Sequence, residues 1–323
     1  MNVVSESFLE ANNRKSNHLG PKEHLKIGAW NVRTMYECGK TAQVVKEMQS
    51  YNIDILGVSE CRWTDCGSVT TSTGETIIYS GRKDNKHHQG VAIIMNEKAE
   101  GALIEWSPVD ERIIVARFHS KYATMTMIQC YAPTNDADDE TKRTFYEKLQ
   151  SITCKTPRHD ILIVLGDMNA KIGIDNLDRE RVICKHGLGT INENGELLVD
   201  FCGDNDLVIG GTLYPHKNIH KITWNSPNGR DKNQIEHLMI NGRWKNSLFD
   251  VRAMRGADNG SDHHLICGKI RLKLRKAVKN RTNKREIFDT FKLKQPEILK
   301  LRIRFQVLEN LQDNKPSTVE SLE

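Results

Sequence analysis

An unbroken run of apolar residues from Ile161 to Leu165 constrains the fold more than any other stretch of the chain. Such a run is typical of a β-strand that is buried on both faces, in a sheet covered by other layers. The turn permitted by Gly166 then lets Asp167 and Asn169 point into one cleft at the carboxyl end of this strand. A carboxylate beside an amide can orient a water molecule and accept its proton. Taken alone, however, the pair is better explained as a turn that ends the strand.

Length and composition indicate a globular protein of enzyme size. The 323 residues, 38% of them hydrophobic, can form a core in one large domain or two smaller ones. The sequence has no run of about 18 apolar residues and no signal-peptide pattern at its N-terminus, so we expect a soluble, intracellular protein without a membrane partner. Its eight cysteines are scattered without a CxxC pair, which favours reduced, buried thiols over a zinc site.

Positive charge is concentrated near the C-terminus. Nine lysines and arginines and no acidic residue lie from Lys269 to Arg285, and the net charge of +5 becomes −4 without them. A mildly acidic body with a basic extension suits a metal–carboxylate site that acts on a polyanion, and we expect Lys273 and Arg275 to contact DNA phosphates. A solvated linker explains the basic run equally well. The cluster over 279–285 is either a nuclear address or part of that linker, and we expect a nuclear rather than a cytoplasmic location.

Two early strands are predicted to deliver polar residues to one edge of a sheet. Strands over residues 25–30 and 53–58 flank a helix over 41–51. Strands separated by one short helix usually lie parallel and adjacent. Asn31 and Glu60, which follow these strands, should therefore leave the sheet side by side.

Later strands also carry polar residues at or near their ends. Tyr131 ends a strand predicted over residues 122–131, Glu236 lies on one over 233–240, and Asp262 and His263 precede the last one. Further strands are predicted over 76–82, 90–95, 113–119, 207–211, 221–224, 251–255 and 264–274, and helices over 139–151 and through Cys202. The layout falls into two halves, each mostly strands with one or two helices. We therefore predict two packed sheets flanked by helices, in the α/β (α+β) class.

The chain is predicted to divide into three segments. Residues 1–24 are polar and aperiodic, which predicts disorder. Residues 25–274 form the folded domain, and residues 275–323 form a basic, partly helical extension. Four tryptophans are expected to lie in the core or to cover a sheet rather than to stack on bases: Trp63, Trp106, Trp224 and Trp244.

The polar residues at the strand ends form a chemically coherent set. They are Asn31, Glu60, Tyr131, Asp167, Asn169, Glu236, Asp262 and His263. Glu60 and Asp262 offer the hard oxygen ligands that Mg²⁺ or Mn²⁺ takes. Asp167 and Asn169 can position an attacking water, and His263 beside a carboxylate can stabilise charge on a phosphate.

Five short motifs, in order, resemble those of the endonuclease/exonuclease/phosphatase superfamily. They are Trp30-Asn31, Ser59-Glu60, YAPT at 131–134, GDMN at 166–169 and SDHH at 261–264. The stretch over 233–265 is more specifically similar to the endonuclease domain of non-LTR retrotransposons and to the craniofacial development protein 2-like proteins derived from them. The resemblance covers residues 25–274. It implies a four-layer α/β/β/α sandwich of two mixed sheets, as in deoxyribonuclease I-like enzymes.

The resemblance also implies an activity and a cofactor. We expect a Mg²⁺-dependent phosphodiesterase, in which Mn²⁺ can substitute, that nicks DNA and leaves 3′-hydroxyl and 5′-phosphate ends. Glu60 resembles the metal ligand, with Asp262 and Asn31 beside it. Asp167 resembles the residue that orients or deprotonates the attacking water.

The remaining roles are implied in the same way. Asn31 and Asn169 would hold Asp167 and the scissile phosphate, and Tyr131 resembles the tyrosine that contacts the phosphate. His263 would donate to a phosphate oxygen, and Glu236 would orient His263.

Two residues depart from the superfamily pattern. Glu236 stands where the motif commonly has the shorter Asp, so we expect it to support His263 less well and the enzyme to be slow. Arg33 stands where some repair enzymes have Asp, which argues against abasic-site repair and against another metal ligand at that position.

Three alternatives stay open. The chain could be a catalytically idle nucleic-acid-binding domain that kept the fold, or a phosphoinositide-type phosphatase. It could also be a fragment, a degenerate copy or a domesticated domain of a longer polyprotein with a reverse transcriptase region. Neither the target sequence nor the oligomeric state follows from the residues.

Overall fold

The computed structural model describes residues 9–10, 24–120, 123–271 and 306 of the chain. The predicted extension over 275–323 lies outside the described residues except for Gln306, and so do the predicted DNA contacts Lys273 and Arg275. Among the described residues, no helix is both long and apolar enough to cross a membrane.

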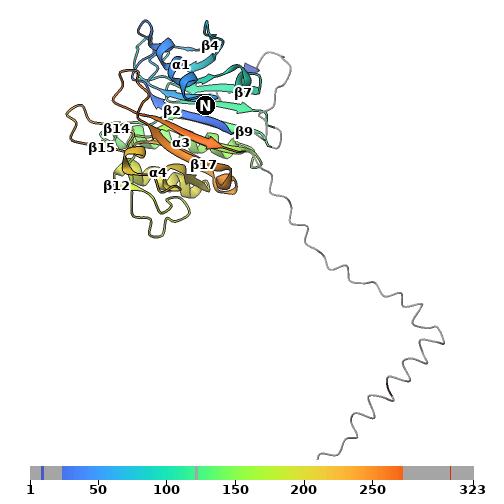
Figure 1. The fold of residues 1–323 in the computed structure, drawn as a ribbon, viewed down its shortest axis with the longest axis vertical. Helices are drawn as coiled ribbons and strands as arrows, with labels where there is room; N and C mark the ends of the chain where they lie inside the picture. Colours follow the sequence, from blue (N-terminus) through green and yellow to red (C-terminus); the bar gives the residue numbers. More distant parts are fainter. Residues whose placement is uncertain (1–8, 11–23, 121–122, 272–305, 307–323) are drawn as a thin grey trace, which may run out of the picture. The chain divides into compact units, whose positions relative to one another are not determined.

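Two mixed sheets of seven strands each form the centre of the molecule (Figure 1). The first has the order β1 (Leu9–Glu10), β7 (Leu103–Asp110), β8 (Ile113–Phe118), β9 (Met125–Tyr131), β10 (Ile161–Asp167), β16 (Glu236–Asn241), β13 (Leu207–Ile209). The second has the order β17 (Leu248–Met254), β18 (Leu265–Ile270), β2 (Leu25–Asn31), β3 (Ile55–Ser59), β6 (Val91–Met95), β5 (Thr76–Ser80), β4 (Cys66–Thr70).

Helices and short ribbons complete the unit. The helices are α1 (Lys40–Ser50), α2 (Glu97–Glu100), α3 (Asp139–Lys155) and α4 (Glu193–Asp204), with the 3-10 turns η1 (Gly210–Thr212), η2 (Asn218–His220) and η3 (Gly242–Ser247). Two ribbons pair β11 (Ile172–Gly173) with β12 (Leu188–Ile191), and β14 (Trp224–Asn225) with β15 (Lys232–Asn233).

The sheets pack face to face through one apolar core. This core joins residues such as Ile27 and Ile93 of the second sheet to Met127 and Ile163 of the first. Because both faces of the central strands are covered, β10 and β3 are buried along their whole length.

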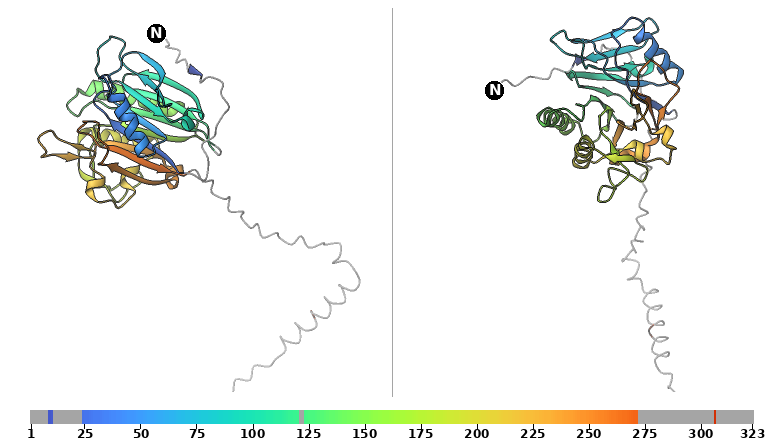
Figure 2. Two further views of the ribbon diagram at one scale, coloured as in Figure 1. Left: turned by 45° about the horizontal axis from the view of Figure 1, so that its top comes forward. Right: turned by 90° about the vertical axis from the view of Figure 1, so that its left-hand side faces the viewer.

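Helices cover the outer faces of the two sheets. Helix α1 buries Val44, Val45 and Met48 against the second sheet, while α3 and α4 bury residues such as Leu149 and Leu198 against the first. Figure 2 shows α1, in blue, and the pair α3 and α4, in green and yellow, on opposite sides of the sheets. The predicted α/β/β/α sandwich of two mixed sheets is thereby confirmed.

Some elements differ from the prediction. Strand β1 lies inside the segment 1–24 that was predicted to be disordered, and pairs with the edge strand β7. Strand β7 was not predicted, because it contains Pro108 and its burial, which is intermediate except at Trp106 and Ser107, does not alternate along the strand. Strand β4 was also missed, since it is exposed along most of its length and carries no apolar face. The strand predicted over 207–211 ends at Ile209, where two glycines begin η1.

Candidate active site

Three polar side chains stand in one row across the first sheet. Asp167 on β10 is the direct partner of Tyr131 on β9 and of Glu236 on β16. Directly opposed residues project from the same face of a sheet, so the hydroxyl and the two carboxylates lie close together. Asp167 and Glu236 are buried, and Tyr131 is partly buried.

The turn at the end of β10 requires a glycine. Gly166 has a φ of 135°, and a Cβ at this position would lie 1.9 Å from the carbonyl oxygen of Cys130. Only glycine fits there. Three residues after Gly166, Asn169 adopts the left-handed conformation, with a φ of 48°, and its backbone N–H donates to Asp167 Oδ1 over 3.0 Å. The predicted turn after Gly166 is therefore present.

The second sheet supplies the partners of this row. Strands β2 and β3 are parallel neighbours, which brings Asn31 and the residue before Glu60 into register, as predicted. The Asn31 Nδ2 group donates both to Glu60 Oε1, over 2.9 Å, and to Asp167 Oδ2, over 2.8 Å. The Tyr131 hydroxyl donates to the same Glu60 oxygen over 3.0 Å. One amide thus links carboxylates from the two sheets.

The two asparagines of the site hold Asp167 in different ways. The Asn31 Oδ1 atom accepts the backbone N–H of Arg33 over 3.0 Å, so this amide faces the carboxylates as a donor. The metal-ligand role of Asn31 stays a prediction. The side chain of Asn169 donates to the carbonyl oxygen of Ala132 over 3.0 Å. Asn169 therefore holds Asp167 through its backbone N–H rather than through its amide.

His263 is fixed from several directions. Its Nδ1 atom bonds directly to Glu236 Oε1, and its backbone N–H donates to Ser261 Oγ over 3.2 Å. The Trp30 indole donates to its carbonyl oxygen over 3.0 Å. The longer Glu236 side chain thus reaches the His263 ring. This contact gives no sign that Glu236 holds the ring less well than Asp would. The Nε2 atom is left as the ring's second polar position.

Burial and mutual charge perturb both titratable groups. Burial raises the pKa of the Asp167 carboxyl to about 7, and the Glu236 carboxylate adds to the shift. Burial favours the neutral His263 ring, but Glu236, Asp167 and Asp262 outweigh it and raise the pKa of His263 to about 9. Burial and Glu60 also raise the pKa of the Tyr131 hydroxyl, which therefore stays a donor. A carboxyl that titrates near neutrality beside a protonated imidazole is typical of general acid–base sites.

A tryptophan belongs to the site although it was predicted to be a core or sheet-covering residue. Trp224 forms an isolated bridge with His263, and its Nε1 donates to Asp262 Oδ2 over 3.0 Å. Its position at the end of a predicted strand was the available signal. The other tryptophans pack in the core clusters or against them, as expected: Trp63, Trp106 and Trp244.

The row opens into a cleft of about 500 Å³. The predicted residues that line the cleft are Glu60, Tyr131, Asp167, Asn169 and His263. Prediction missed five polar lining residues: Asn135, Asp136, Lys171, Asn192 and Asn233. The first four lie outside the predicted strands, and Asn233 is the first residue of the strand predicted over 233–240.

The donor set fits a hard divalent cation. Asp167, Glu236 and His263 offer ligand atoms within 4.8 Å of one another, but Glu236 and His263 already bond to each other. The predicted metal set of Glu60, Asp262 and Asn31 stays a prediction. Two buried carboxylate oxygens, Glu236 Oε2 and Asp262 Oδ1, have no hydrogen-bond partner among the described residues. Carboxylate oxygens of this kind are suitable ligands for Mg²⁺ or Mn²⁺.

These features define the class of the protein. Its fold is that of the apurinic/apyrimidinic (AP) endonucleases and of the exonuclease/phosphatase proteins. The catalytic domain of Xenopus laevis APE2 has a TM-score of 0.58 and 17% identity, covering 76% of this chain and 92% of that one. The endonuclease domain of TRAS1, a telomere-specific non-LTR retrotransposon, has a TM-score of 0.55 and 16% identity, covering 78% and 100%. The 3′ phosphatase NExo from Neisseria, bound to a product DNA hairpin, has 0.57 and 18%, covering 76% and 99%.

The particular relatives are proteins named craniofacial development protein 2. This chain is 41% identical to those of Tragulus javanicus and Bos taurus over 254 residues, which is 79% of its length, and is their homologue. It spans 43% and 42% of their lengths, which is less than half of each. No family model matches the chain. The resemblance inferred from the five motifs is thereby confirmed.

Proposed function

We propose that the chain is a metal-dependent phosphodiesterase that nicks DNA and leaves 3′-hydroxyl and 5′-phosphate ends. The observation that carries this proposal is the buried Asp167, which accepts donors from Asn31 and Asn169 beside a His263 aligned by Glu236. A catalytically idle module would have no need to keep ionisable groups buried in this arrangement, because burying them is costly.

Asp167 acts as the proton acceptor for the attacking water. Its pKa of about 7 makes it a competent base near neutral pH. The hydrogen bonds from Asn31 and from the Asn169 backbone keep both of its oxygens oriented toward the cleft edge. The attacking water is thereby positioned for in-line displacement at phosphorus.

His263 stabilises negative charge on the phosphate. Glu236 occupies Nδ1 and keeps the ring charged, so Nε2 is the donor available to a phosphate oxygen. Tyr131 and Asn169 also line the cleft, where their polar groups can orient the phosphate.

A divalent cation, which we propose to be Mg²⁺, would polarise the phosphate and neutralise charge that develops on it. Glu60 and Asp262 would hold it. In each of them, one oxygen already bonds to a neutral donor, while the other lies near an arginine.

DNA is the proposed substrate because related folds include the endonuclease domain of a retrotransposon and an enzyme bound to a DNA hairpin. We also propose a nuclear location and a retrotransposon origin, in which a longer parent carried a reverse transcriptase region. The homology to craniofacial development protein 2 supports that origin.

The test is an analysis of product ends. Supercoiled plasmid is incubated with the protein and Mg²⁺, and the nicked product is offered to DNA ligase and to DNA polymerase. We expect nicks that are resealed and extended without end repair. Nicks that ligase cannot seal would contradict the proposed ends, and phosphate release from inositol polyphosphates without any nicking would indicate the phosphatase alternative.

A further inference from the structure

Two arginines lie beyond the ends of the strands that deliver Asn31 and Glu60. Arg33 follows β2 and Arg62 follows β3, each two residues after the polar residue of its strand. Backbone hydrogen bonds continue the parallel pairing past both strand ends, so the two turns lie side by side. Both arginines adopt the left-handed conformation, with φ values of 60° and 58°. Non-glycine residues in this conformation often mark functional turns.

Each guanidinium faces one carboxylate of the site. Arg33 Nη1 lies 3.5 Å from Asp262 Oδ1, and Arg62 Nη2 lies 3.3 Å from Glu60 Oε2. The arginine side chains are 54% and 38% exposed. Loose, exposed pairs of this kind contribute little to folding stability, and each leaves most of the five guanidinium donors unused. The pairs are therefore easily exchanged.

The charge of the site indicates which ligand can replace the carboxylates as partners of the two arginines. The cleft and its wall hold five carboxylates, which repel a polyanion that enters: Glu60, Asp136, Asp167, Glu236 and Asp262. Arginine binds phosphate through two parallel hydrogen bonds, which is a better match for its planar group than the single contacts seen here.

We propose that Arg33 and Arg62 bind backbone phosphates of the nucleic acid beside the cleft, each leaving its carboxylate to do so. The inference rests on the proposed function and names residues that hold its substrate. The exchange also frees oxygens of Asp262 and Glu60 in the same step.

An aromatic surface next to these arginines fits a nucleic acid better than a free phosphate. The Tyr36 ring is 60% exposed and stacks on His87 with 3.9 Å between the ring centroids. The His87 Nδ1 atom lies 2.9 Å from the carbonyl oxygen of Arg62, which joins this stack to the arginine turn. An exposed aromatic ring beside a phosphate contact can also pack against the bases or sugars of a nucleic acid, which a free phosphate lacks.

The test is equilibrium binding of a labelled duplex oligonucleotide to the full chain in EDTA, over a series of salt concentrations. Each phosphate contact that is lost should reduce the slope of log K against log salt by about 0.9. We expect this reduction, with weaker binding at low salt, in Arg33→Gln and in Arg62→Gln. The double variant should lose about twice as much.

Arg143→Gln is the matched control, because Arg143 on α3 is also exposed, at 65%, and pairs with Glu140. A parent that binds DNA, with slopes for Arg33→Gln and Arg62→Gln equal to that of Arg143→Gln, would overturn this inference and leave the proposed function standing. A folded parent that binds no DNA would overturn both. Unfolding temperatures within the range of the control variant ensure that a loss of binding is not a loss of fold.

Discussion

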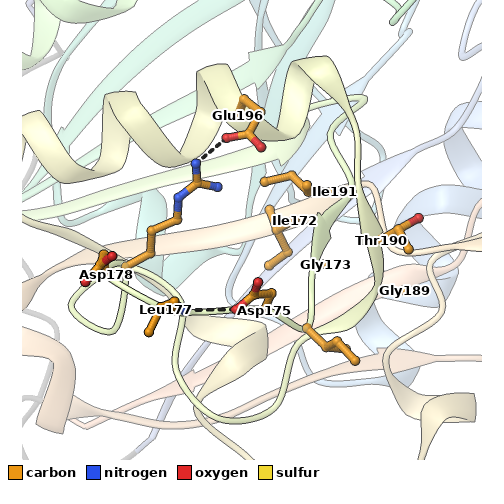
Figure 3. A pocket seen from close by; sticks show the side chains of 11 residues that line it. Ile172, Gly173, Asp175, Leu177, Asp178, Gly189, Thr190, Ile191 and Glu196 are labelled. Carbon is orange, nitrogen blue, oxygen red and sulfur yellow. Dashed lines mark hydrogen bonds and ion pairs between the residues drawn. The ribbon is translucent and has the colours of Figure 1, made fainter.

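Two hollows of similar size in the molecule differ in the environment of their charged groups. The active-site cleft measures about 500 Å³, and a pocket between the β11–β12 ribbon and α4 measures about 580 Å³ (Figure 3). In the second pocket Glu196 pairs with Arg179 over 2.5 Å, and Asp175 accepts the backbone N–H of Leu177 over 3.1 Å. Leu177, which projects from the loop, is 73% exposed.

The difference lies in what the charged groups have as partners. In the pocket of Figure 3, Glu196 is partly exposed and pairs with one arginine, and Asp175 is exposed and accepts a backbone N–H. In the cleft, Asp167 and Glu236 are buried. Asp167 shares the Asn31 amide with Glu60, and Glu236 bonds to His263. Burial and the neighbouring carboxylate raise the pKa of Asp167, and the carboxylates raise the pKa of His263. Size alone would not distinguish the two, whereas buried and mutually coupled ionisable groups do.

The largest expected effect contrasts one variant from each hollow. His263→Ala should lower the rate of DNA nicking by roughly 10³-fold, because it removes the donor to the phosphate. Glu196→Gln, which breaks the ion pair of the other pocket, should leave the rate unchanged. Single-turnover nicking assays compare them. Equal losses in both variants would remove the distinction between the two hollows.

The next effect sharpens the role of Glu236. Its Oε1 bonds directly to His263, so Glu236→Asp should withdraw the carboxylate by one methylene and slow nicking by about a hundredfold. The measurement is kcat/KM for the parent and the variant. A variant as fast as the parent, or faster, would show that the contact with the longer side chain is not the productive one.

A smaller effect is expected for the hydroxyl of Tyr131. Tyr131→Phe removes one hydrogen bond to Glu60 and should cost about tenfold in kcat/KM, as expected for one hydrogen bond to a charged group. Tyr146→Phe is the matched control, because the buried Tyr146 hydroxyl has no hydrogen-bond partner among the described residues. If the control loses as much activity as Tyr131→Phe, the hydroxyl of Tyr131 has no special role.

The smallest effect is on stability and depends on pH. The pKa of Asp167 is raised in the folded state, so the stability it contributes is present below its unfolded pKa of about 4 and is lost as pH rises to about 7. The Asp167→Asn variant, which has no carboxyl group at this position, does not lose stability in this way as pH rises. The unfolding temperature of the variant minus that of the parent, measured in EDTA, should therefore increase from pH 5 to pH 8. A constant difference would mean that folding does not raise the pKa of Asp167.

The parts of the site that follow from strand periodicity could be predicted from the sequence. Parallel pairing of β2 with β3 and of β9 with β10 brings Asn31, Glu60, Tyr131 and Asp167 to one edge, and each of these strands has a strong apolar pattern. The two-sheet sandwich follows from the same strands.

The remainder depends on contacts between segments that are distant in sequence. The bond from Trp224 to Asp262 and the pairing of Arg33 with Asp262 form where loops meet, and no local pattern encodes such a meeting. The orientation of the Asn31 amide could not be predicted for a related reason. An amide offers both a donor and an acceptor, and only the position of the Arg33 backbone N–H decides which of them faces the carboxylates.

The most direct test of the account is nicking of supercoiled plasmid by the parent and by Asp167→Asn, each with Mg²⁺ and with EDTA. The account predicts open-circle product from the parent with Mg²⁺, none with EDTA, and almost none from a variant that unfolds at a temperature close to that of the parent. Nicking that persists in EDTA or in Asp167→Asn would contradict it. A folded parent that does not nick with Mg²⁺ or Mn²⁺ would contradict it equally.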